Sequence, residues 1–149
     1  MKKIFNIIFV SAAILISAMQ ISVAQTKPLV VISNAKGAPS ELKRTELLAV
    51  MKGEKQRWDD GTRISIALMK SSTPTGEETS KKVYGMSGDE VNKFWLALVF
   101  QGKAKAPVFF NTAAELESYI SQTPGAIGII EESGDSKSKS VVIEGRKTL

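Results

Sequence analysis

Hydrophobic residues recur with two different spacings along this chain of 149 residues, and the spacings separate predicted strands from predicted helices. Short runs rich in β-branched residues predict buried strands. These runs are Leu29 to Ser33, Ile64 to Leu68, Ala126 to Ile130 and Val141 to Ile143. Residues Val108 to Phe110 are either a further short strand or an extended segment that covers the core.

Apolar residues spaced three and four positions apart predict three helices, and a capping-box spacing predicts a further one that is weak in apolar residues. These run from Ser40 to Gly53, from Thr75 to Tyr84, from Ser87 to Gly102, and from Thr112 to the break at Pro124. The third helix has the clearest pattern, with apolar side chains at Val91, Phe94, Trp95, Leu98 and Val99. Between the first helix and the next strand, Trp58 to Gly61 reads as a turn that ends in an Asp-Gly dipeptide.

Each predicted helix begins with a residue suited to cap its free N–H groups. Ser40 is the expected N-cap of the first helix. The other three helices begin with a Ser or Thr followed three positions later by Glu, which is the spacing of a capping box. The pairs are Thr75 with Glu78, Ser87 with Glu90, and Thr112 with Glu115.

The order of the elements predicts an α/β fold. Strands and helices alternate up to residue 130, and the polar segment Glu131 to Ser140 then forms a hairpin or loop before the last strand. Its acidic residues are expected to face solvent. Alternation of this kind implies a mixed, mostly parallel sheet with helices on both faces. We therefore expect a single three-layer lobe.

The first 24 residues have the pattern of a secretory signal. Lys2 and Lys3 precede an apolar stretch from Ile4 to Ile16, and the small residues Ser22 and Ala24 suit cleavage after Ala24. A membrane anchor is the alternative, but the apolar run is short and interrupted by polar residues. We expect residues 1–24 to be removed, residues 25–149 to form one domain, and the product to reside in the periplasm without membrane insertion.

Composition narrows the chemistry of the protein. The sequence has no histidine and no cysteine, so Ser-His-Asp and Cys-His catalysis are excluded and no disulfide can form. The adjacent acids Asp59 and Asp60 lack the spaced oxygen ligands of a calcium loop and are expected to serve the turn. Basic residues are scattered among acids, which argues against nucleic acid as a partner. We expect no catalytic residues, no metal site and no cofactor.

Three segments, in their order along the chain, carry a family resemblance. They are Trp58 to Gly61, Phe94 to Gly102, and Pro124 to Gly128. Together with the first strand and helix they resemble one lobe of the phosphate-binding proteins that serve bacterial ABC importers, which have a type II periplasmic-binding-protein fold. The resemblance spans residues 29–145 and covers only one of the two lobes of that family.

The resemblance implies an oxyanion site formed by hydroxyls and by N–H groups at helix starts. The corresponding residues here are Ser33, Asn34, Ser71, Ser72, Thr73 and Thr75. The last four of these, Ser71, Ser72, Thr73 and Thr75, also fit an ordinary polar loop with a helix cap, and that alternative stays open. Two departures bear on the site. Residues 77–82 lack the arginine and aromatic residue that the family often has there, and Glu77 and Glu78 would repel an anion.

These patterns favour an exported solute-binding-like module that binds phosphate or another oxyanion for ABC-type uptake. A second copy in a homodimer, or an envelope protein partner, would complete the cleft that one lobe leaves open. The alternative is an envelope interaction or scaffold protein that has kept the lobe fold without its ligand. An enzyme is disfavoured, because no competent base or nucleophile pair is visible.

Overall fold

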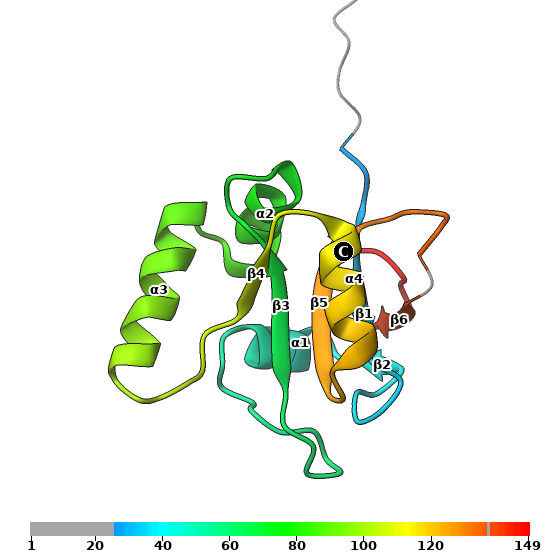
Figure 1. Ribbon diagram of the computed structural model, residues 1–149, viewed down its shortest axis with the longest axis horizontal. Coiled ribbons are helices and arrows are strands. Elements are labelled where there is room, and N and C mark those ends of the chain that lie inside the picture. Colours follow the sequence, from blue (N-terminus) through cyan, green and yellow to red (C-terminus); the bar gives the residue numbers. More distant parts are fainter. Residues whose placement is uncertain (1–25, 137) are drawn as a thin grey trace, which may run out of the picture.

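A computed structural model describes residues 26–136 and 138–149 (Figure 1); the predicted signal segment lies outside the described residues. The strands are β1 (Leu29–Ser33), β2 (Glu41–Leu42), β3 (Ser65–Met69), β4 (Val108–Phe110), β5 (Ala126–Glu131) and β6 (Lys139–Ile143). The helices are α1 (Arg44–Met51), α2 (Pro74–Thr79), α3 (Gly88–Phe100) and α4 (Ala113–Gln122), with a π-helical segment η1 (Ser80–Tyr84) continuing α2.

The strands of the described part form one mixed sheet in the order β2-β6-β1-β5-β3-β4. β3 pairs in parallel with β4 and β5, and β2 pairs in parallel with β6. β1 is antiparallel to both of its neighbours, β5 and β6. Three of these five pairs are parallel, which confirms the predicted mixed, mostly parallel sheet. The hairpin considered for Glu131 to Ser140 is wrong, because β5 and β6 lie on opposite sides of β1.

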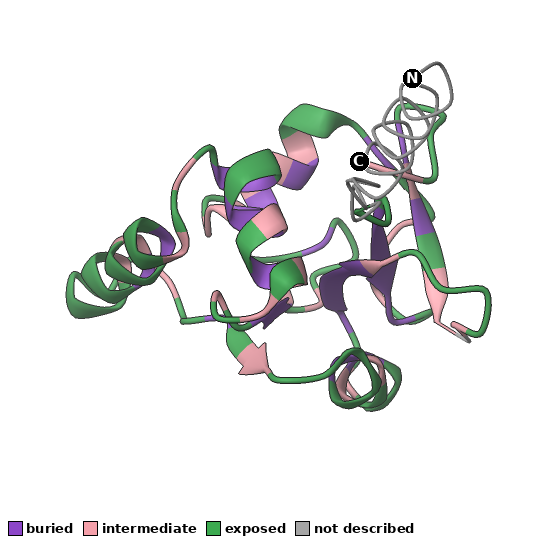
Figure 2. Cartoon of the chain, turned by 90° about the horizontal axis from the view of Figure 1, so that it is seen from above, coloured by how far each residue is buried: buried purple, intermediate pink, exposed green. Residues whose placement is uncertain are grey.

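Helices cover both faces of the sheet (Figures 1 and 2). Alternation along β1 sends Val31 into a cluster with residues of α1, η1 and α3, and sends Ile32 into a second cluster with α4. α4 contributes Leu116 and Ile120, both almost fully buried. The three-layer α/β lobe predicted from the sequence is confirmed.

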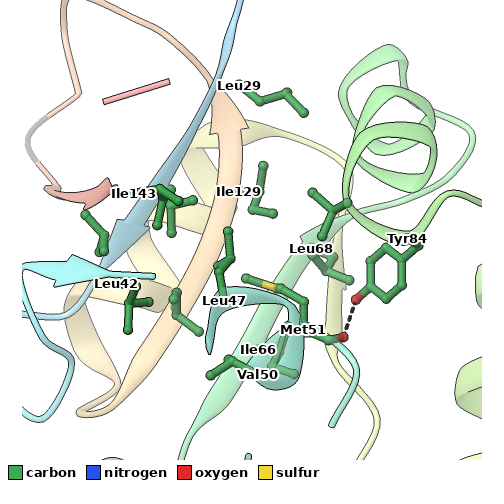
Figure 3. Packing of buried hydrophobic residues seen from close by; sticks show 14 of the residues in the cluster. Leu29, Leu42, Leu47, Val50, Met51, Ile66, Leu68, Tyr84, Ile129 and Ile143 are labelled. Carbon is green, nitrogen blue, oxygen red and sulfur yellow. Dashed lines mark hydrogen bonds between the residues drawn. The ribbon is translucent and has the colours of Figure 1, made fainter. Parts of the chain in front are cut away.

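The cluster on the α1 face contains a buried polar contact (Figure 3). The Tyr84 hydroxyl at the end of η1 donates to the carbonyl oxygen of Met51 at the end of α1, over 2.7 Å. The indole N–H of Trp95 in α3 donates to the same hydroxyl at 3.3 Å. Burial raises the pKa of Tyr84 far above its ordinary value, so the hydroxyl stays protonated. One side chain thus joins three helical elements.

The expected helix starts are partly correct. The capping boxes at Ser87 and Thr112 are both formed, which confirms those two boundaries. The N-cap expected at Ser40 is wrong: residues Glu41 and Leu42 form β2 beside β6, and α1 begins three positions later behind Lys43, which makes no side-chain cap bond. Pairing at the sheet edge holds this segment extended and so overrides the local helix signal.

The capping box expected at Thr75 is also wrong. Thr73 is the N-cap of α2, and its side chain accepts a hydrogen bond from the N–H of Gly76. Pro74 occupies the first helical turn, where its fixed φ angle and missing N–H suit a helix start. The inner face of α3 is narrower than predicted, because Val99 is exposed while Val91 and Trp95 are buried.

Candidate functional site

The loop between β3 and α2 holds three of the six candidate residues, and a fourth, Thr75, lies in the first turn of α2. β3 ends at the buried Met69, and the N–H of Lys70 then donates to the carbonyl oxygen of Phe110 in β4. The side chain of Thr73 folds the loop back, because its hydroxyl donates to the Lys70 carbonyl at 2.7 Å. A Cβ at Gly76 would lie 2.0 Å from this carbonyl oxygen, so only glycine fits where the helix packs against the loop.

Several hydrogen-bond donors in this loop are free. The backbone N–H groups of Ser71, Ser72 and Thr75 meet no acceptor within the described part of the chain. Ser71 accepts a bond from the amide of Asn92 in α3 at 3.2 Å, which leaves its own O–H able to donate. Ser72 is exposed. Free donors just before a helix are the groups that bind an oxyanion in proteins.

The start of α3 lies beside the same loop. A Cβ at Gly88 would be 2.4 Å from the Cβ of Ser71, so a side chain at position 88 would push the loop away. Sequence reasoning missed both Gly88 and Asn92, because neither lies near the loop along the chain. Their only sequence signal is the predicted start of α3.

A carboxylate also reaches the loop. Glu131, at the end of β5, accepts a hydrogen bond of 3.0 Å from the Thr75 hydroxyl. Its expected place in a solvent-facing charged segment is wrong, since the residue is only partly exposed and joins β5 to α2. Because β5 is parallel to β3, the ends of both strands meet at the same edge of the sheet.

The acids inside α2 are paired with lysines one turn later. Glu77 lies 2.6 Å from Lys81, and Glu78 lies 3.3 Å from Lys82. The hydrogen bond from Lys81 lowers the pKa of Glu77. The ion pairs reduce the negative field that these two acids would otherwise place near the loop.

The structure does not bring Ser33 and Asn34 to this loop. β1 runs antiparallel to β5, so its carboxyl end lies at the edge of the sheet opposite the β3–α2 loop. Ser33 stands across from Ile127, which stands across from Ile66 near the start of β3. Strand spacings place Ser33 about 14 Å from Met69, with the loop farther still. One oxyanion cannot contact both groups of residues.

The side chain of Asn34 is occupied within the fold. Its amide donates to the carbonyl oxygens of Ile120 and Ser121 at 2.8 and 3.1 Å, which caps the end of α4. Its side-chain oxygen accepts from the N–H of Lys36. The hydroxyl of Ser33 is buried and has no partner among the described residues. Asn34 therefore fixes the position of α4.

A cavity of about 800 Å³ opens at this second edge of the sheet. Its wall includes Lys36, Lys139 and the acid Glu117. The ammonium group of Lys139 already donates to the carbonyl oxygen of Ala38 at 3.0 Å. Charges of both signs and the carbonyl end of α4 surround the space, so it has no consistent preference for an anion.

Two further properties concern the described residues only. Across residues 26–136 and 138–149, no group of three acidic side chains is placed to hold a metal ion. Of the helices in this part of the chain, none is long and apolar enough to cross a membrane.

The solved structures that match this chain agree with one another on its fold. No family model and no curated relative matches the sequence. The solved structure of an ABC-type phosphate transport receptor from Vibrio cholerae matches 83% of this chain and 49% of that chain, with a TM-score of 0.63 and 16% identity. PstS from Borrelia burgdorferi matches 83% of this chain and 49% of its own, with a TM-score of 0.62 and 15% identity.

A putative phosphate ABC transporter substrate-binding protein from Clostridium perfringens, solved with bound phosphate, is similar to the same degree. It matches 82% of this chain and 47% of its own, with a TM-score of 0.62 and 12% identity. The chain thus spans about half the length of the solved structures it matches. The chain has the α/β fold of a single lobe of the periplasmic-binding-protein type, as found in phosphate ABC transporter substrate-binding proteins.

Proposed function

We propose that this chain binds inorganic phosphate at the β3–α2 loop and acts, after export to the periplasm, as a solute-binding lobe in ABC-type uptake. The observation that carries the proposal is the group of free N–H donors at Ser71 and Ser72, in the tight loop before α2, and at Thr75, in the first turn of α2. The structural neighbours support the choice of ligand, since their names describe proteins of phosphate transport.

Each residue of the loop has a distinct part in the proposal. The N–H groups of Ser71, Ser72 and Thr75 donate to phosphate oxygens, and the hydroxyls of Ser71 and Ser72 add two donors. Thr73 does not contact the ligand, because its hydroxyl already accepts from Gly76 and donates to Lys70. Its role is to hold the loop in shape.

Glu131 gives the proposed site a preference among oxyanions. A carboxylate can only accept hydrogen bonds, and near neutral pH phosphate keeps a proton that it can donate, whereas sulfate has none. A phosphate at Thr75 would lie beside the Glu131 carboxylate, which is 3.0 Å from the Thr75 hydroxyl. Sulfate there would face an unpaired negative charge, so the site favours phosphate.

The proposed site is open on one side. Ser72 is exposed, and the chain spans about half of the length of the neighbouring structures. Ligand hydrogen bonds that remain exchangeable with water contribute little net free energy. We propose that a second lobe, from another copy or from an envelope protein, completes the cleft. Sedimentation velocity with and without phosphate tests whether a second copy does so.

Thermal unfolding with added phosphate tests binding. A ligand at a hundredfold excess over its dissociation constant stabilises the native state by about 2.7 kcal/mol, which raises the melting temperature. Replacing Ser71 and Ser72 by alanine should reduce the rise, because it removes the two proposed hydroxyl donors and leaves the backbone N–H groups in place. Ser40→Ala is the matched control, because Ser40 is exposed and lies in the segment before α1, away from this loop. An unchanged response in the double variant would remove the two hydroxyls from the proposed site.

A second candidate function is protein or surface interaction without a ligand. The exposed apolar side chains of α3 favour it, since large exposed apolar groups mark interaction surfaces. A melting temperature that does not change at millimolar phosphate would support this second function over the first.

A further inference from the structure

The outer side of α3 exposes large apolar side chains. In the described part of the chain, four large hydrophobic residues are exposed, and three of them, Leu96, Val99 and Phe100, lie in the second half of α3. Phe100 is 83% exposed. The fourth, Val108, begins the edge strand β4. Leu96 and Phe100 expose more than half of their surface, so these side chains lie outside the core of the lobe.

α3 lies at one end of the molecule, outside the area of the sheet (Figure 1). It is anchored mainly through Val91 and Trp95, and most of its surface is exposed in the view from above (Figure 2). The end of α3 therefore protrudes, and a flat surface can approach it without meeting the rest of the lobe.

The same region is basic. The 24 residues from Val91 to Ala114 contain no aspartate or glutamate and include three lysines, all exposed: Lys93, Lys103 and Lys105. None of them forms an ion pair with a described residue. Helical spacing puts Lys93, Leu96 and Phe100 on one stripe, at i, i+3 and i+7. Cationic side chains thus lie on both sides of the apolar cluster along the chain.

The combination of lysines with large apolar side chains favours a lipid surface over a protein as the partner. Protein interfaces are depleted in lysine, whereas surfaces that lie on lipid combine lysine with Phe and Leu. Lysine near an anionic lipid surface is attracted to it, and its long apolar stem tolerates the boundary between water and hydrocarbon. We propose that the end of α3 and the loop to Lys105 dock on an anionic lipid surface, with Phe100 inserted among the lipids.

The proposed contact is peripheral, since only the end of α3 and the loop after it reach the lipid. The acids Asp89 and Glu90 lie at the far end of α3, in its first turn. Electrostatic repulsion from the lipid therefore favours a tilted helix whose carboxyl end faces the surface.

A fluorophore at Ala97 tests this contact directly. The sequence has no cysteine, so Ala97→Cys gives a single labelling site on the exposed side of α3. With an environment-sensitive dye there, vesicles containing phosphatidylglycerol should shift the emission to the blue, and phosphatidylcholine vesicles should not. The same dye at Ser118→Cys, exposed on α4, should not respond. This readout separates contact by α3 from any lipid binding by residues 1–25.

Substitutions in the labelled chain test the apolar and the electrostatic components of the proposed lipid contact. Phe100→Ser should weaken the vesicle response by about tenfold, because one large apolar side chain no longer enters the lipid. Lys103→Ser with Lys105→Ser should weaken it by more than about tenfold. Lys43→Ser with Lys147→Ser changes the net charge equally at two exposed positions outside this segment and should have little effect.

Three results would overturn the proposal. The first is no blue shift at Ala97 with anionic vesicles in large excess. The second is an equal shift with neutral vesicles, which would remove the role of charge. The third is a shift that appears without lipid and grows with protein concentration, which would show that a second copy covers α3.

Discussion

Replacing Tyr84 by phenylalanine removes one oxygen atom from the core and leaves the ring in place. Two buried partners then lose their hydrogen bonds: the carbonyl oxygen of Met51, 2.7 Å from the hydroxyl (Figure 3), and the indole N–H of Trp95, 3.3 Å from it. Neither group gains access to water, because Met51 and Trp95 are almost fully buried.

The expected loss of stability follows from these two groups. A buried polar group left without a partner costs about 1 to 3 kcal/mol, and the bond at 3.3 Å is the weaker of the two. The apolar area and the packing volume hardly change, so no cavity term is added. Tyr84→Phe should therefore lower the free energy of unfolding by about 2 to 4 kcal/mol, a large fraction of the stability of an ordinary domain.

Urea unfolding followed by tryptophan fluorescence measures the difference, with Tyr119→Phe as a matched control. Tyr119 is the only other tyrosine, and its hydroxyl lies 2.6 Å from that of Ser65, where both residues are partly exposed. Water can replace that partner, so the control should lose about 1 kcal/mol or less. Equal losses in the two variants would refute the assigned role of Tyr84.

The raised pKa of Tyr84 adds a dependence on pH. The unfolded chain ionises this tyrosine near pH 10, whereas the folded chain keeps its proton to higher pH. Above pH 10 the folded state therefore binds more protons than the unfolded state, and stability falls as pH rises, by up to about 1.4 kcal/mol per pH unit. Tyr84→Phe should lack this component of the alkaline loss.

Three further predictions concern single positions. Glu131→Gln should shift the ratio of phosphate to sulfate affinity towards sulfate, measured by calorimetry, because an amide no longer repels an unprotonated anion near Thr75; an unchanged ratio would contradict the selectivity argument. Gly76→Ala should lower stability by about 2 to 4 kcal/mol in urea unfolding, since a Cβ there would lie 2.0 Å from the Lys70 oxygen, and a neutral result would show that the loop is loose. The hydrogen bond from the backbone N–H of Ser87, the N-cap of α3, lowers the pKa of Glu90 in the folded chain. The Glu90 carboxylate therefore stabilises the fold at pH values above its ordinary pKa of about 4.5. This stabilisation is lost as the pH falls through the lower pKa of the folded state. The stability difference between Glu90→Gln and the native chain should shrink across that acid range, and a constant difference would count against the capping bond.

The elements predicted correctly depend on local chemistry. The capping boxes at Ser87 and Thr112 need only residues three positions apart, and the buried strands need only short apolar runs. The failures have non-local causes. Ser40 precedes a sheet-edge strand instead of a helix, because β6 from the far end of the chain pairs there.

The six candidate site residues lie at two opposite edges of the sheet, and this division also has a non-local cause. Ser33 and Ser71 both follow a buried strand, and in a fully parallel sheet both would lie at one edge. The antiparallel direction of β1 separates them, and nothing within five residues of β1 signals that direction. The contact of Glu131 with Thr75 joins residues 56 positions apart, so sequence reasoning placed this acid in solvent.

Titration of the ¹⁵N-labelled chain with phosphate, followed by amide NMR, is the most direct test of the proposed site. The amide signals of Ser71, Ser72 and Thr75 should move together with one dissociation constant, while those of Ser33 and Asn34 stay in place. Sulfate at equal ionic strength should move them less. Amide signals that move at Ser33 and Asn34 instead, or nowhere at millimolar phosphate, would contradict an oxyanion site in the β3–α2 loop.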